Sequence, residues 1–292
     1  MARPSGLLSV LSAALAVSVL AAAAAALAGP AAPTVEEAAV IVEKDEAGGL
    51  IAHRALYRVG LGPSGGSFSP VAEVSGSMMY RFTDACDGWT VENNTQMRLV
   101  YNQGRQVDTT WSFLSWEAKD GLSYRFRVAQ GRNGRTVLKL RGQAELERPG
   151  GPGLARLDEP AGKTIELPAG TVFPTKHFLA LIGGAKGGSK TMARVVFDGA
   201  SLDNPYLINA VMGGVGSQER QSIAALAGLA EAPAWRFRMA FFPYASRAEL
   251  PDFELDVRYR GDGIAGRLLQ DFGDFSLDLK PSEIELLEGG GC

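Results

Sequence analysis

The sequence contains few of the residues on which most metal centres and many enzymes depend. It has two cysteines, Cys86 and Cys292, and two histidines, His53 and His177, in 292 residues. These four residues are far apart in the sequence, and a structural zinc site needs a full set of such ligands close together. We therefore predict no metal and no other cofactor. Histidine-dependent catalysis would have to use His53 or His177, and no catalytic motif surrounds either residue.

The sequence also lacks an excess of charge of either sign and has few long apolar runs. The chain has 29 basic and 32 acidic side chains, which give a net charge of −3. This mild, mixed balance does not indicate a nucleic-acid partner. After the N-terminus, no apolar run approaches the ~20 residues of a membrane-spanning helix. We therefore predict a mature chain without a transmembrane span.

The long apolar run at the N-terminus has the pattern of a secretory signal peptide. Arg3 supplies the positive charge, residues 7–27 are rich in alanine and leucine, and Ala26-Leu27-Ala28 is a small-x-small cleavage site. A signal peptide at residues 1–28 is predicted, and a retained membrane anchor is the alternative. No cysteine lies near the predicted cut, which argues against a lipoprotein. Residues 29–49, rich in proline, alanine and glutamate, are predicted to form a flexible tether.

If the chain is exported, its two cysteines are in an oxidising compartment. In an oxidising compartment two cysteines are more often paired than free. Cys86 lies beside an Asp-Gly turn, and Cys292 is the last residue, after Glu-Gly-Gly-Gly. Two unrelated cysteines are the alternative, but the compartment and the even count favour a Cys86–Cys292 disulfide. Such a bond would fasten the end of the chain to the first third of the domain.

From Leu50 onward the sequence is typical of β-strands. Short segments rich in β-branched and aromatic residues are separated by turn residues, and Asp120-Gly121, Asn133-Gly134 and Asp262-Gly263 are hairpin signals. The glycine- and proline-rich residues 147–162 are interpreted as a long turn within one domain, with a linker between domains as the alternative. The pattern predicts an all-β, mainly antiparallel domain over residues 50–292, curved or closed to bury its apolar faces.

One segment is predicted to be helical. Phe178, Leu179 and Ile182 have helical spacing, Thr175 is a suitable N-cap and Gly183 a suitable stop. The following glycine-rich string, residues 183–191, does not match a phosphate-binding loop. Its Lys190 follows a serine where that motif requires a glycine, and the string is expected after a helix and before a strand.

Several strings point to a known family. They are ACDGW at residues 85–89, FLSWEAKDGLSYRFRV at 113–128, LPAGTVFPTKHF at 167–178, VFDGA at 196–200 and the terminal cysteine. Together they resemble the cell-envelope-integrity EipB family of periplasmic proteins. The resemblance implies a large β-spiral similar to the open barrels of the lipoprotein carriers LolA and LolB, with a helix plugging or covering the concave face. It also implies a periplasmic location, a role in the envelope of Gram-negative cells, a disulfide between Cys86 and Cys292, and no catalytic activity.

Two functions follow from these observations. The first is a non-enzymatic protein that binds an apolar ligand, such as a lipid or lipoprotein, or a periplasmic protein partner. The predicted apolar lining of the concave face consists of Trp111, Phe113, Tyr124, Phe126, Trp235, Phe237 and Phe241. Phe178, Leu179 and Ile182 would belong to a lid over residues 176–188. The alternative is a hydrolase of envelope glycan or lipid that uses His53 or His177 with a carboxylate.

Overall fold

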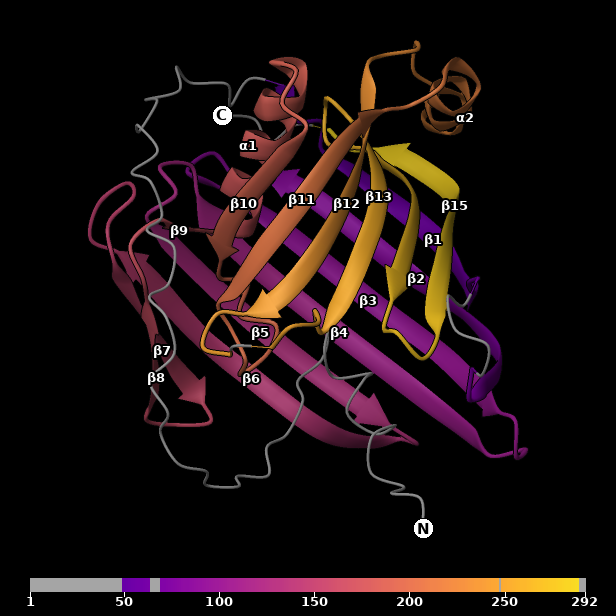
Figure 1. Cartoon of the computed structure of the whole chain (residues 1–292), viewed down its shortest axis with the longest axis horizontal. Coiled ribbons are helices and arrows are strands. Elements are labelled where there is room, and N and C mark those ends of the chain that lie inside the picture. Colours follow the sequence, from indigo (N-terminus) through magenta and orange to yellow (C-terminus); the bar gives the residue numbers. More distant parts are fainter. Residues whose placement is uncertain (1–48, 64–68, 247, 289–292) are drawn as a thin grey trace.

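The computed structural model describes residues 49–63, 69–246 and 248–288, and its fifteen strands all belong to one sheet. The first eight strands pair in sequence order as an antiparallel meander. They are β1 (His53–Leu61), β2 (Val71–Asp84), β3 (Gly88–Tyr101), β4 (Gln106–Ala118), β5 (Ser123–Arg132), β6 (Arg135–Leu146), β7 (Gly153–Glu159) and β8 (Lys163–Leu167). The meander forms the rear wall in Figure 1.

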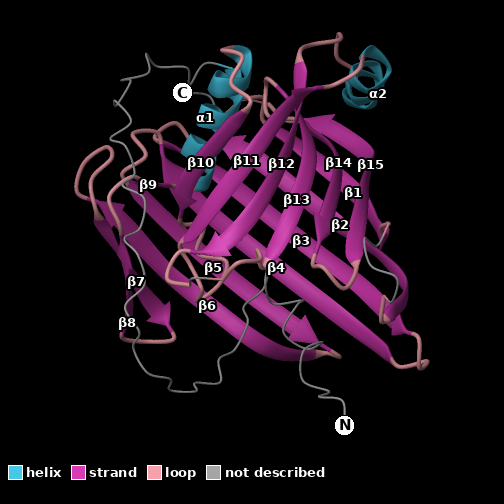
Figure 2. Ribbon diagram, viewed as in Figure 1, coloured by secondary structure: helices cyan, strands magenta, loops and turns pink. Residues whose placement is uncertain are grey.

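The remaining strands form the front wall. They are β9 (Thr171–Val172), β10 (Thr191–Val196), β11 (Tyr206–Gly214), β12 (Ala234–Pro243), β13 (Phe253–Arg260), β14 (Ala265–Asp271) and β15 (Ser276–Leu286). Only the short pairing of β9 with β10 is parallel among the described strands. The last strand, β15, pairs with β1, so the two walls join there and the sheet curls into a nearly closed barrel (Figures 1 and 2). The prediction of an all-β, mainly antiparallel open barrel is confirmed.

The hairpins form where the sequence predicts tight turns. Asn133 and Gly134 both have positive φ, 48° and 76°, and connect the paired residues Arg132 and Arg135. Positive φ at both central positions defines the turn whose twist matches that of the flanking strands. The interpretation of residues 147–162 as one long turn is wrong, because β7 lies within them. Leu154 and Arg156 alternate there with buried residues, a pattern that the flanking glycines and prolines obscure.

The predicted helix is present, but its bounds differ from the prediction. Helix α1 spans Pro174–Lys186, with Phe173 at the N-cap position. Thr175 is therefore inside the first turn, and Gly183 continues the helix instead of ending it. A Cβ atom at the next glycine, Gly184, would lie 3.1 Å from the methyl carbon of Met192. Helix α1 thus packs closely against β10 here, and a larger residue would have to displace the Met192 methyl group.

A second helix, α2 (Ser217–Ala227), was not predicted. It packs against β15 at the rim of the barrel (Figure 2) and buries Ile223, Ala224 and Ala227. Gly228, in the left-handed conformation at φ 63°, ends it. So short an apolar face, on a segment otherwise exposed and polar, gives a weak helical signal. Within the described ranges, neither helix is long and apolar enough to cross a membrane.

Candidate functional site

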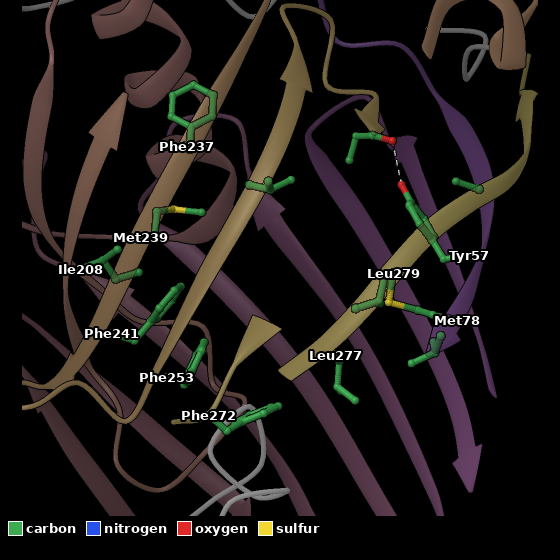
Figure 3. Packing of buried hydrophobic residues seen from close by; sticks show 14 of the residues in the cluster. Tyr57, Met78, Ile208, Phe237, Met239, Phe241, Phe253, Phe272, Leu277 and Leu279 are labelled. Atoms are coloured by element: carbon green, nitrogen blue, oxygen red, sulfur yellow. Dashed lines mark hydrogen bonds between the residues drawn. The ribbon is translucent and has the colours of Figure 1, made fainter. Parts of the chain in front are cut away.

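The interior of the barrel contains a cavity with two lobes. Lobe 1, of about 310 Å³, lies between the rear strands β1–β4 and the front strands β11–β15. Figure 3 shows the side chains of Phe241, Phe253 and Phe272 pointing inward from the front wall, with Tyr57 and Met78 coming from β1 and β2. Inward direction follows from strand geometry, since successive side chains point to opposite faces. On β12, for example, Phe241 is inward and Arg238 is exposed.

Lobe 2, of about 290 Å³, lies beside α1. Its walls include Phe82 and Phe113 from the rear strands and Thr175 and Phe178 from α1. Six residues border both lobes, and we call them the waist: Tyr80, Asn93, Trp111, Asp198, Ala200 and Tyr259. The two lobes therefore meet at a narrow set of mostly polar side chains inside an otherwise apolar cavity.

Hydrogen bonding at the waist is incomplete. The Asn93 side chain donates to the Met78 sulfur at 3.3 Å and accepts from the Thr95 hydroxyl at 3.1 Å. The indole Nε1 of Trp111 is buried and has no hydrogen-bond partner in the described part of the chain. A buried N–H without an acceptor costs free energy, so an acceptor brought in by a ligand would be stabilised there.

The cavity has no positive charge. None of the described residues that line either lobe is lysine, arginine or histidine, and Asp198 is the one carboxylate. Burial raises the pKa of Asp198 above its ordinary value, although the Ala200 N–H donates to its carboxylate at 2.8 Å. Burial also raises the pKa of Tyr259 to about 12. A buried anion would lack a counter-charge here, so the cavity favours an apolar, uncharged occupant with a hydrogen-bonding group.

A buried glutamate fixes the start of α1. Glu117 on β4 is 1% exposed, and its two carboxylate oxygens accept the N–H groups of Thr175 at 2.6 Å and Lys176 at 2.8 Å. These are two of the N–H groups that a helix leaves unpaired at its N-terminus. Burial raises the pKa of Glu117 to about 7, despite the opposing effect of these two hydrogen bonds and of the nearby Lys176. The carboxyl group thus holds α1 against the rear wall.

The predicted lid residues all lie on α1. The Phe178 ring packs edge-to-face on Tyr259 of the waist, with centroids 4.9 Å apart, and borders lobe 2. Ile182 is buried in the core and Leu179 is half-buried. Gly183 and Gly184 of the predicted lid are helical, so a hinge of the lid would lie near Gly187 and Gly188, beyond Lys186.

The structure separates the aromatic residues predicted to line the concave face. Trp111 borders both lobes, Phe113 borders lobe 2 and Phe241 borders lobe 1. Phe237 is fully buried among other side chains. Trp235 borders an outer hollow beside α2. Period-two alternation alone does not distinguish a side chain that faces empty space from one that is covered.

Tyr124 and Phe126 do point inward, but other aromatic rings fill the space in front of them. Tyr124 stacks on Phe173 with centroids 5.0 Å apart, and Phe126 meets Phe197 at 5.6 Å. The rings of Phe173 and Phe197 come from the segments before and after α1. They belong to the strings at residues 167–178 and 196–200, whose sequences did not indicate a packing role.

Sequence reasoning missed most of the waist. Asp198 lies in the VFDGA string, and its backbone carbonyl accepts the Tyr124 hydroxyl at 3.0 Å. Tyr80 and Tyr259 occupy inward positions of strands β2 and β13, which are far apart in the sequence. The alternating pattern of each strand was visible, but the pattern does not show that these strands face each other.

The two histidines are both buried, and neither forms a catalytic pair in the described part of the chain. His53 Nδ1 lies 2.7 Å from the Ile51 carbonyl oxygen, and its ring lies near those of Tyr80 and Phe82. Burial, together with a smaller effect of the nearby Arg194, lowers the pKa of His177 to about 4. Within the described residues neither ring is hydrogen-bonded to a carboxylate, so the geometry gives the hydrolase alternative no support.

Cys86 lies in the turn between β2 and β3. Its φ is 65°, and its N–H donates to the Asp84 carboxylate at 2.9 Å. Cys292 lies outside the described residues, as do the predicted signal peptide and all but the last residue of the predicted tether. The Cys86–Cys292 pairing, the signal peptide and the tether stay predictions.

Comparison with known proteins identifies the family. The family model described as EipB-like matches residues 44–288. The chain belongs to the EipB-like family. The cell envelope integrity protein EipB of Brucella abortus (strain 2308) is 27% identical over 250 residues, which cover 83% of this chain and 88% of the relative.

A solved structure agrees with the fold. The crystal structure of a β-barrel-like protein with the domain of unknown function DUF1849, from Brucella abortus, matches with a TM-score of 0.73 and 25% sequence identity. The match covers 82% of this chain and 99% of that one. The resemblance recognised from the sequence is confirmed.

Proposed function

We propose that this chain is a non-enzymatic periplasmic protein that helps maintain the cell envelope by holding an apolar ligand inside its barrel. The envelope role is inferred from the similar protein named as a cell envelope integrity protein, and the periplasmic location from the predicted signal peptide. A lipid or the acyl part of a lipoprotein has the required chemistry.

The two-lobed cavity is the observation that carries this proposal. Lobes of about 310 and 290 Å³ lie at the lower end of the ~300–1,000 Å³ range of ligand sites. Apolar groups of the ligand would fill the lobes, and a neutral acceptor such as an ester or amide carbonyl would sit at the waist beside Trp111. Because no basic side chain faces the lobes, a free carboxylate or phosphate would have to stay outside.

Helix α1 would act as the movable wall. It borders lobe 2 through Phe178, and Glu117 fixes its first turn while Gly187 and Gly188 follow its last. Gly187 and Gly188 would let the C-terminal end of α1 move while Glu117 holds its first turn, and this rotation would separate Phe178 from Tyr259 and enlarge lobe 2 without breaking the sheet. A ligand or a protein partner that contacts α1 could drive this displacement.

The double substitution Phe178→Ser and Leu179→Ser tests the proposal. It removes the ring that closes lobe 2 on Tyr259, so binding of a fluorescent hydrophobic dye should rise several-fold over wild type while the β content seen by circular dichroism stays the same. Displacement of the dye by a monoacylglycerol, and weaker displacement by the fatty acid of equal length, would support an uncharged ligand.

The matched control is Leu226→Ser, which changes an exposed leucine, 39% accessible, on α2. This variant should bind the dye as the wild type does. If the α1 variant is folded and its dye binding also equals that of the wild type, the interior does not admit ligands and the proposal is wrong.

A further inference from the structure

The outer surface of the rear wall carries a concentration of positive charge on a chain whose net charge is −3. We define the basic face by five exposed side chains of β5, β6 and β7: Arg125, Arg127, Lys139, Arg141 and Arg156. Glu145 and Asp158 are the exposed acidic residues on the same three strands. Arg156 lies 3.9 Å from Glu145, and the five basic and two acidic side chains give the basic face a net charge of +3, although the protein is mildly acidic.

The basic face includes an unfavourable pair. Arg127 and Arg141 lie directly opposite each other on β5 and β6. Arg141 has Asp158 at 3.4 Å, whereas Arg127 has no ion-pair partner in the described part of the chain. Like charges in directly opposite positions destabilise a sheet. An anion that bound between the two guanidinium groups would remove that repulsion.

Apolar side chains are interleaved with these charges. Leu114 lies opposite Arg127, and the Arg125 guanidinium lies over the Trp116 ring at 4.8 Å from its centroid. A shallow hollow of about 460 Å³ lies among these side chains. Leu114 and Val137 are 45% and 54% exposed. Arginine mixed with a half-buried tryptophan and exposed aliphatic side chains is a composition suited to a membrane interface.

We propose that the basic face docks on the surface of an anionic phospholipid bilayer. The charges spread over three adjacent strands of an open sheet, which suits a two-dimensional layer of phosphates better than a single acidic peptide lying along one groove. Leu114 and Val137 would enter the headgroup region while the arginines contact the lipid phosphates. This surface is on the outside of the barrel, so it does not depend on the cavity or its ligand.

Vesicle sedimentation tests the proposal with the chain that begins at Gly29, the predicted mature form. The protein should bind vesicles of mixed phosphatidylglycerol and phosphatidylcholine, bind pure phosphatidylcholine much more weakly, and dissociate as salt is added. Replacing Arg127 and Arg141 together by glutamine should weaken binding to the anionic vesicles about 30-fold, because each basic residue near such a surface contributes about 1 kcal/mol.

The matched control replaces Arg238 and Lys190 by glutamine. Arg238 is an exposed arginine of β12 whose acidic partner, Glu254, lies at 3.5 Å, and Lys190 is the exposed residue before β10. The control therefore removes the same amount of charge, but from the front wall. Binding of the control should fall less than about threefold, as expected for a change in net charge alone. Equal losses in both variants, or no binding of wild type to anionic vesicles, would overturn the proposal.

Soluble polyglutamate separates a bilayer from an acidic protein partner. If the chain binds polyglutamate through Arg127 and Arg141 but does not bind anionic vesicles, the basic face serves an acidic protein and the bilayer proposal is wrong. Vesicle binding that polyglutamate does not displace would support the bilayer.

Discussion

The two ends of the barrel interior are built in opposite ways. At the packed end, Tyr124 and Phe126 of β5 meet Phe173 and Phe197, and both of the latter are fully buried. At the hollow end, strands of the same sheet present equally apolar side chains to the two lobes. Both ends have the same strand spacing and alternation. The difference arises from the segments around α1. At the packed end Phe173 and Phe197 fill the space, whereas Phe178 and Asp198 only border the lobes.

Small residues make the packed end possible. Gly199 has a φ of 66°, and a Cβ atom there would collide with the Phe126 ring. The ring therefore lies directly on the backbone next to Phe197. At the hollow end no chain segment within the described ranges enters the lobes. Filling a wide barrel takes inserted residues, and the absence of such residues at one end leaves room for a ligand.

The largest effect should come from emptying the packed end. Phe173→Ala removes a fully buried ring that stacks on Tyr124, and we expect a loss of about 4 kcal/mol in the free energy of unfolding. Phe178→Ala, the control, removes a half-buried ring beside an existing cavity and should cost about 1–2 kcal/mol. Urea unfolding of both variants measures the difference, and equal losses would contradict the distinction between the two ends.

A smaller effect concerns Glu117, which joins α1 to the rear wall. Its pKa is about 7 in the folded protein against 4.5 for an exposed glutamate, so ionisation costs more in the folded state. The contribution of Glu117 to stability should therefore be most favourable below about pH 4.5 and should fall by about 3 kcal/mol as the pH rises through 7. Glu117→Gln should lack this loss, because glutamine does not titrate.

The measurement is the difference in unfolding free energy between wild type and Glu117→Gln from pH 4 to pH 8. His177 titrates in the opposite sense, since its lowered pKa makes the protein lose stability as the pH falls from about 6.5 to about 4. Taking the difference between the two proteins cancels that contribution. A difference that does not change with pH would show that Glu117 keeps an ordinary pKa.

The smallest of the three effects should come from Cys292→Ser. The predicted disulfide would hold the end of the chain beside Cys86, next to β2 and β3, which line lobe 1. The bond would attach the end of the chain beyond β15, so its loss leaves every strand pairing in place, and we expect a loss of about 2 kcal/mol, the low end of the usual range. Thermal unfolding with and without reductant measures it, and a wild type insensitive to reductant would argue against the bond.

Local signals in the sequence predicted most of the sheet. Asn133-Gly134 specifies its hairpin through backbone conformation alone, and the alternation in β4 and β12 distinguishes inward from outward residues. The strings at residues 85–89 and 167–178 were specific enough to identify the family. These features depend on residues close together in the chain, which is why they could be recognised.

The site depends on distant contacts, and these were not predictable. Glu117 was visible as one carboxylate among many, but its role comes from Thr175 and Lys176, which approach it only in the folded barrel. Phe173 lies next to a short strand and a proline, so no periodicity indicated that its ring fills the interior. Helix α2 was missed because its three buried residues give a weak pattern.

The pairing of β1 with β15 has a consequence for how the site comes into existence. His53 faces Leu286 where β1 pairs with β15, so this pairing joins the two ends of the described domain. All other neighbouring strands of the sheet are close together in the sequence. Tyr57 and Val59 on β1 and Leu277 and Leu279 on β15 all border lobe 1. Neither the rear wall nor the front wall alone encloses a lobe. An incompletely synthesised chain therefore has no binding site, and the cavity forms only when the final strand docks.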